Sequence, residues 1–122
     1  MPIVAKILIG LIAALHAYIM WFEIFAWESR GPRIFTSLPA DLFGPTTAMA
    51  ANQGLYNGFL AAGLIWALVI RDAHWARNVA TFFLVCIAVA GIFGAVTVSP
   101  SILIVQTVPA CLALAAAYLL GR

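Results

Sequence analysis

The sequence predicts an all-α polytopic membrane protein, in which four antiparallel transmembrane helices form a compact bundle. Two observations lead to this fold class. Hydrophobic residues make up 66% of the 122 residues and charged residues only 8%, whereas about a quarter of the residues in a soluble domain are charged. The hydrophobic residues also form four long stretches separated by more polar segments, and each stretch is long enough to cross a bilayer.

The first span is expected over residues 3–27, where the ionisable side chains are Lys6, His16 and Glu23. A helix rises about 1.5 Å per residue, so this segment exceeds the hydrocarbon thickness of about 30 Å. Its apolar run is too long for a cleaved signal peptide and lacks a good small-residue cleavage site. We therefore expect it to remain in the protein as a helix.

The other three spans are expected over residues 47–70, 78–98 and 101–120. Only Ser99 and Pro100 separate the last two spans, so these helices should form a tight antiparallel pair. Together with the first span they define a single four-helix transmembrane domain over residues 1–122.

Residues 28–46 form the one long connection and mix charged with apolar side chains, so we expect a long loop on the membrane surface. The pairs Gly31-Pro32 and Gly44-Pro45 should form turns at its ends, and Ser37 should cap a short interfacial helix near Pro39. A simple tether is the plainer interpretation of this loop, and a lid is the alternative.

The distribution of cationic residues predicts the topology. Four cations flank one face of the membrane and two flank the other: Lys6, Arg71, Arg77 and Arg122 against Arg30 and Arg33. Cytoplasmic loops and ends of membrane proteins carry an excess of positive charge, so both termini are expected in the cytoplasm. The membrane is expected to be a bacterial inner membrane. Because the difference is only two charges, an inverted or dual topology stays an alternative.

Charge and cysteine content exclude several function classes. The net charge is +2 without a run of like charges, which argues against a nucleic-acid partner. Cys86 and Cys111 lie in apolar stretches without metal-ligand spacing, so neither a disulfide framework nor a zinc site is expected. We expect no metal and no other cofactor.

A stripe of functional candidates runs along the first span. His16, Met20, Glu23 and Trp27 follow at spacings of four, three and four residues, which places them on one helix face. A carboxylate inside a membrane is expensive, and such residues usually serve a function. Glu23 is thus the candidate general acid or base, with His16 as its proton partner. Alternatively, Glu23 anchors the loop by pairing with an arginine such as Arg30 or Arg33.

Amide side chains cluster at the start of the second span. Asn52 and Tyr56 form one i,i+4 pair, and Gln53 and Asn57 form another. Gly54 and Gly58 are four residues apart, a spacing that lets a neighbouring helix approach closely. These amides either bind a ligand or act as structural hydrogen bonds between helices.

The fourth span adds one more amide, Gln106, close to Pro109, which leaves a backbone carbonyl without its donor. Depth along the spans places Glu23 and most of the amides in the outer leaflet. We therefore expect a polar funnel about 10 Å deep that opens towards the long loop. The expected catalytic residues are Glu23 and His16, and the expected ligand-binding residues are Asn52, Gln53, Tyr56, Asn57, Gln106 and Trp27.

Several of these motifs resemble the DUF1304 family of small integral membrane proteins. The resembling strings are His16-Ala-Tyr-Ile-Met-Trp-Phe-Glu23, Gly31-Pro-Arg-Ile-Phe35, Ala51-Asn-Gln-Gly-Leu-Tyr-Asn-Gly58 and Gln106-x-x-Pro109. The resemblance covers nearly the whole chain. It implies a four-helix membrane protein of unknown activity, so it supports the fold without adding chemistry.

Three functions follow from the predicted funnel. The favoured one is a pocket for a small amphiphile or lipid, with proton-transfer chemistry at Glu23. The second is a minimal proton-linked transporter of small solutes, which would act as a homo-oligomer because four helices hardly enclose a pathway. The third is a structural accessory subunit. The expected partners are membrane lipid, a small amphiphilic or polar ligand and, for transport, further copies of the chain. Whether the protein is an enzyme stays open.

Overall fold

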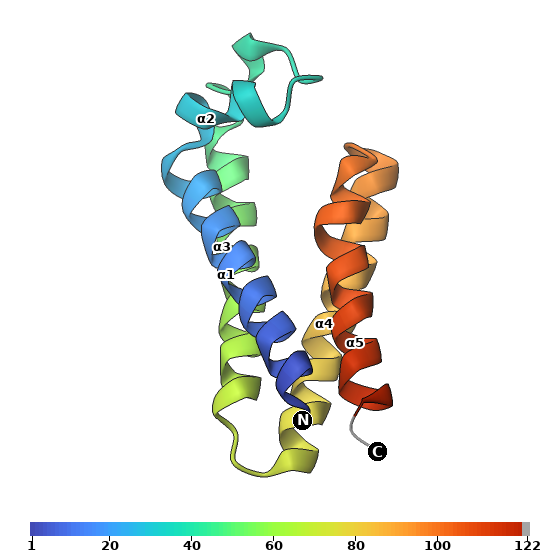
Figure 1. Ribbon diagram of the computed structural model, residues 1–122. Helices are drawn as coiled ribbons and strands as arrows, with labels where there is room; N and C mark the ends of the chain where they lie inside the picture. Colours follow the sequence, from blue (N-terminus) through green and yellow to red (C-terminus); the bar gives the residue numbers. More distant parts are fainter. Residues whose placement is uncertain (121–122) are drawn as a thin grey trace. The chain divides into compact units, whose positions relative to one another are not determined.

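The computed structural model describes residues 1–120, and this part of the chain is all-helical without strands (Figure 1). Arg122, one of the cations used for the topology prediction, lies outside the described residues. The elements in chain order are α1 (Ile3–Phe25), α2 (Trp27–Ile34), η1 (Ala40–Leu42), α3 (Thr47–Val69), α4 (Ala73–Thr97), η2 (Leu103–Thr107) and α5 (Val108–Leu119).

The prediction of an all-helical protein is confirmed, with one helix boundary that differs by several residues. α4 begins at Ala73, five residues before the expected span. Asp72 explains the early start, because its side-chain oxygen accepts a hydrogen bond from the backbone N–H of Trp75 at 2.9 Å. This bond caps the helix and satisfies one of its free donors.

The segment 28–46, which was expected to be a loop, contains most of α2 and all of η1. The turn predicted at Gly31-Pro32 is wrong, because both residues lie inside α2. Gly31 is buried against the ring of Phe43, where a Cβ atom would collide with that ring. The 3-10 helix η1 follows Pro39 and has no side-chain cap, so Ser37 does not cap it.

Two helices, α1 and α4, are long and apolar enough to cross a membrane. The segment Leu103–Leu119, which joins η2 to α5, is apolar but shorter. α3 has the same 23-residue length as α1, but its amide-rich first half makes it more polar. These findings support membrane association without fixing the number of spans.

The backbone forms two compact units, which we describe separately. One unit, Ala14–Ala61, contains the second half of α1, the segment with α2 and η1, and the first half of α3. Trp27 is the centre of its aromatic cluster, with ring centroids 5.6 Å from Phe22, 5.7 Å from Phe35 and 5.0 Å from Phe43. This cluster fixes the connection between α1 and α3.

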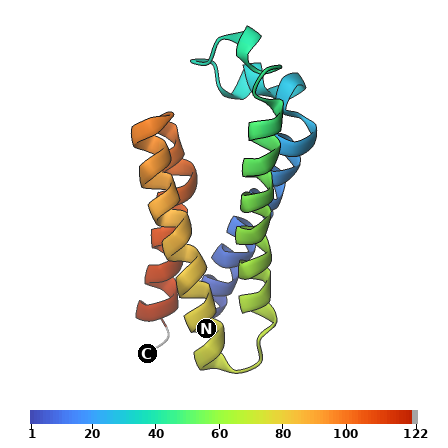
Figure 2. The same cartoon turned by 180° about the vertical axis from the view of Figure 1, so that it is seen from behind.

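The other unit combines Met1–Ala13 with the described residues from Ala62 onward. Within it, α4 lies antiparallel to η2 and α5, as both views show (Figures 1 and 2). Gly91 faces Thr107, and a Cβ atom on Gly94 would lie 2.9 Å from Ile102. The expected tight pair of helices around Ser99 and Pro100 is therefore present.

A π-helix interrupts the second arm of this pair. η2 ends where the backbone N–H of Val108 bonds to the carbonyl of Leu103, which is the i→i−5 pattern of a π-helix. Pro109 follows at once and has no N–H to give to the carbonyl of Val105. The proline thus accounts for irregular backbone hydrogen bonding at the place where the sequence predicted a freed carbonyl.

Candidate functional site

The candidate site lies where the second half of α1 contacts the first half of α3. Gly54 is buried there, and an added Cβ atom would lie 2.9 Å from Ile24, 3.0 Å from the Cβ of Glu23 and 3.1 Å from the carbonyl oxygen of Met20. A Cβ on Gly58 would lie 2.5 Å from the sulfur of Met20. The two glycines therefore allow the helices to approach closely, as their spacing predicted.

A carboxyl–amide pair sits at this contact. Glu23 on α1 and Asn57 on α3 are each only 8% exposed, and the Asn57 amide donates to the Glu23 carboxyl oxygen Oε1 at 2.7 Å. The same amide nitrogen donates to the backbone carbonyl of Gln53 at 3.2 Å. Both amide hydrogens are thus used, and they hold the Asn57 side chain towards Glu23.

The partner of Glu23 in this pair is neutral, which matters for its chemistry. A hydrogen bond from an amide stabilises a carboxylate but does not balance its charge, and an unbalanced buried charge is costly. The alternative that Arg30 neutralises Glu23 does not match the structure. Arg30 instead donates to the Tyr18 hydroxyl at 3.1 Å and lies 5.1 Å from the Trp21 ring centroid. Glu23 is therefore a buried acid whose hydrogen-bond donor is a neutral amide.

His16 is fully buried on the same helix, but it is not adjacent to Glu23. Seven residues separate them, which corresponds to about 10 Å along a helix. The role of His16 as the proton partner of Glu23 therefore stays a prediction.

The structure does not bring all predicted amides to Glu23. Asn52 and Gln53 are exposed, and the Tyr56 side chain is 56% exposed. Asn52 precedes Gly54 by two residues, which turns it about 200° away from the contact with α1. Gln53 precedes Asn57 by four residues and flanks the contact. Gln53 borders the buried pair through its backbone carbonyl, which accepts from the Asn57 amide.

Trp27 hydrogen-bonds to a residue just before α3, and Gln106 lies in the other unit. The indole N–H of Trp27 donates to the Thr46 hydroxyl at 2.9 Å, and the ring belongs to the aromatic cluster described above. Trp27 thus holds the connection between α1 and α3 rather than presenting a free donor. Gln106 lies half-buried in η2 of the other unit, so its expected position beside Glu23 stays a prediction.

Sequence reasoning did not identify Asn57 as the partner of Glu23. The signal was present in the glycine spacing, because Asn57 lies three residues after Gly54 and one before Gly58, on the face that contacts α1. Residues three and four apart share a helix face. The glycines therefore indicate which of the clustered amides points towards the neighbouring helix.

No group of three or more His, Cys, Asp or Glu side chains that could hold a metal ion occurs among residues 1–120. Cys86 is half-buried and Cys111 is exposed, and both are free thiols.

Comparison with known proteins adds a family but no activity. The sequence model of the family described as "Protein of unknown function (DUF1304)" matches residues 10–118. The chain is also similar to the uncharacterized protein YpaA of Lactococcus lactis subsp. lactis (strain IL1403), with 31% identity over 120 residues that cover 97% of this chain and 99% of the relative. No solved structure matches the chain significantly.

Proposed function

Because the chain belongs to the DUF1304 family of proteins of unknown function, we propose a function from the site: a membrane protein that binds a small amphiphilic or polar ligand at Glu23 and Asn57. In this proposal α1, α3, α4 and the η2–α5 segment each cross the membrane as an antiparallel four-helix bundle. The apolar length of α1 and α4 supports the membrane location.

The proposed orientation has both termini in the cytoplasm of a bacterial cell. Lys6, Arg71 and Arg77 then lie on the cytoplasmic side, and Arg30 and Arg33 lie outside. A cysteine that replaces Ser37 should react with a membrane-impermeant thiol reagent in intact cells, and one that replaces Ala73 should not. Both variants need a background without Cys86 and Cys111. The reverse labelling pattern would refute the orientation.

The observation that carries the proposed binding function is the hydrogen bond between Glu23 and Asn57. Two apolar side chains would pack these helices without the cost of burying a carboxyl group. Gln53 borders the pair and is exposed, which gives a ligand polar contacts on the way to Glu23. A ligand with a cationic or hydroxyl head group would hydrogen-bond to the carboxyl group, and its apolar part would contact the exposed hydrophobic faces of the helices.

Proton transfer is the chemistry open to this pair. Glu23 can donate or accept a proton at a carboxyl oxygen, while Asn57 orients the carboxyl group through its amide. A purely structural role for the pair is the competing explanation, because interhelical amide hydrogen bonds also stabilise membrane helices.

A proton-linked transporter is the second candidate function, and one observation favours it. Asn52 and Tyr56 are exposed on the face of α3 that points away from α1. Polar side chains that face lipid are unfavourable unless another protein surface covers them. A homo-oligomer would cover this face and supply the additional helices that a solute pathway requires.

Glu23→Gln tests the binding function, and Glu28→Gln is its matched control. Glutamine keeps an acceptor for Asn57 and removes the charge and the exchangeable proton. Glu28 is an exposed acid whose Oε1 accepts a hydrogen bond from Thr47 at 3.0 Å. Mass spectrometry of small molecules that co-purify should find a ligand on the wild type and on Glu28→Gln but not on Glu23→Gln, at similar thermal stability. If Glu23→Gln retains the same molecules, the pair is structural. Solute flux driven by a pH gradient in proteoliposomes would support transport instead.

A further inference from the structure

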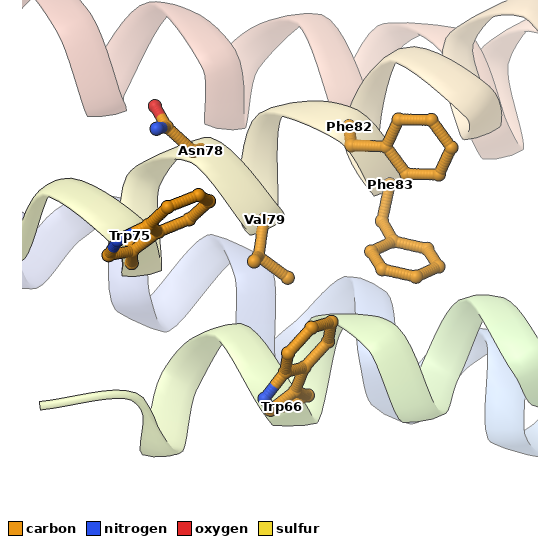
Figure 3. A pocket seen from close by; sticks show the side chains of 6 residues that line it. All are labelled: Trp66, Trp75, Asn78, Val79, Phe82 and Phe83. Atoms are coloured by element: carbon orange, nitrogen blue, oxygen red, sulfur yellow. The ribbon is translucent and has the colours of Figure 1, made fainter. Parts of the chain in front are cut away.

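A shallow apolar groove that shares no residue with the Glu23 site lies within the unit that contains α4. Its volume is about 240 Å³, and it lies between the end of α3 and the start of α4. Figure 3 shows the six lining residues: Trp66, Trp75, Asn78, Val79, Phe82 and Phe83.

The walls of the groove are almost entirely aromatic or aliphatic. Trp66 of α3 points towards Val79 and Phe83 of α4 (Figure 3). The ring of Phe83 lies directly over Gly63, where a Cβ atom would collide with it. Because glycine has no side chain, the ring fits there. Phe82 is 64% exposed and meets Phe83 edge-on. Such a surface fits a hydrocarbon chain.

One end of the groove is polar. The Asn78 amide lies 3.1 Å from the His74 ring nitrogen Nε2, one turn closer to the start of α4. Arg71 is exposed in the turn that joins α3 to α4, just before the N-cap residue Asp72. Asp72 is occupied with capping the helix. Arg71 therefore gives this end a positive charge, and the His74 ring adds a second polar group.

From these contacts we propose that the groove binds one phospholipid with an anionic head group. Its phosphate lies at Arg71 and His74, and one acyl chain lies against Trp66, Val79 and Phe83. The distance from His74 to Phe83 is about 13 Å along the helix, so the site has the same head-to-tail polarity as a lipid. Basic groups at the cytoplasmic ends of membrane helices are suited to anionic head groups, and Trp75 has the side chain preferred at the membrane–water interface.

A second copy of the chain is a poorer occupant for this groove. A stable protein interface buries about 800 Å² on each partner, and a shallow groove with six lining residues is too small to supply that area. The positive end also matches a phosphate better than another cationic chain with a net charge of +2. The inference depends on the proposed membrane location of α4 but not on Glu23.

Native mass spectrometry of the full-length protein with phosphatidylglycerol or phosphatidylcholine tests the proposal. Val79→Trp fills the groove, and Val89→Trp places the same bulk at an exposed position of α4 outside it. Arg71→Gln removes the cation at the polar end, and Lys6→Gln is its charge-matched control. We expect one tightly retained phosphatidylglycerol on the wild type, on Val89→Trp and on Lys6→Gln.

The two groove variants should change different properties. Val79→Trp should lose the retained lipid, whereas Arg71→Gln should bind phosphatidylglycerol about fivefold more weakly, so that its preference over phosphatidylcholine falls. The proposal is overturned if the wild type retains both lipids equally, or if Val89→Trp loses lipid as Val79→Trp does. A change in oligomeric state with Val79→Trp at constant lipid content would also overturn it and identify a subunit interface. Because Glu23→Gln leaves this groove intact, loss of its ligand and loss of this lipid are independent results.

Discussion

The two helix contacts built on glycine pairs differ in what they bury. In the Ala14–Ala61 unit, Gly54 and Gly58 bring α1 against α3, and the contact contains the Glu23–Asn57 pair. In the other unit, Gly91 and Gly94 bring α4 against the η2–α5 arm. A side-chain hydrogen bond beside these glycines runs from the Thr107 hydroxyl to the Ala88 carbonyl at 2.9 Å, and the Thr81 and Tyr118 hydroxyls, 2.8 Å apart, join the same helices further along.

This difference separates packing from chemistry. Both contacts achieve a close approach through glycine, so a carboxyl group is not required to bring these helices together. Beside Gly91, the α4 contact uses a hydroxyl and a backbone carbonyl, which carry no charge. The charged group of this helix pair, the Arg77 guanidinium, lies away from the glycines and 5.0 Å from the Tyr118 ring centroid. The presence of Glu23 at the α1 contact therefore needs a further explanation, and a binding or proton-transfer role provides one.

The largest loss of stability is expected from substitutions that remove the close approach. Gly91→Leu should cost about 3 kcal/mol, because the added Cβ atom meets the backbone nitrogen of Thr107. Gly54→Leu should cost somewhat less, since the nearest backbone atom lies 3.1 Å from a Cβ on Gly54 but 2.7 Å from a Cβ on Gly91. The free energy of unfolding in mixed micelles measures both. A small effect of Gly91→Leu would show that this contact is not tight in solution.

Smaller losses should distinguish the buried polar groups of the two contacts. Asn57→Leu leaves the carboxyl group of Glu23 without its amide donor and should cost about 2 kcal/mol. Thr107→Val removes the neutral hydrogen bond to Ala88 at nearly constant shape and should cost about 1 kcal/mol or less.

A double variant provides the control for this pair of predictions. Replacing Glu23 and Asn57 together by leucine leaves no buried polar partner unpaired, so much of the loss should be recovered. If Asn57→Leu and Thr107→Val have equal effects in the same unfolding experiment, the carboxyl–amide pair is ordinary helix packing and the contrast between the contacts disappears.

The sequence predicted where the helices lie better than it predicted which side of each helix a residue faces. Apolar stretches predicted the long helices, and the Gly54–Gly58 spacing predicted the close approach to α1. The grouping of Asn52 and Gln53 with Glu23 relied on depth in the membrane, which does not specify direction around a helix. Asn57 is the amide on the α1 face, because it lies about 60° from Gly54 around the helix and its side chain donates to Glu23.

The segment 28–46 shows a second limit of sequence reasoning. Gly31 and Pro32 are typical of turns, but the ring of Phe43, which lies eleven residues beyond Pro32 in the sequence, covers Gly31 inside α2. Local turn signals do not contain such a contact. Similarly, the Trp27–Thr46 hydrogen bond joins residues nineteen apart, so the structural role of Trp27 could not be read from its helix stripe alone.

The smallest effects on stability are expected at the exposed amides, where the functional effects should differ. Asn52→Leu and Gln53→Leu should each change the free energy of unfolding by less than about 0.5 kcal/mol, because both side chains are exposed. Gln53 borders the Glu23–Asn57 pair, so Gln53→Leu should lose the co-purifying ligand, whereas Asn52→Leu on the opposite face should retain it. Thermal unfolding and mass spectrometry on the same preparations measure both properties. Should both variants retain the ligand, the binding site does not extend to Gln53. A change of oligomeric state in Asn52→Leu would instead indicate that this face contacts another copy of the chain, as the transporter alternative requires.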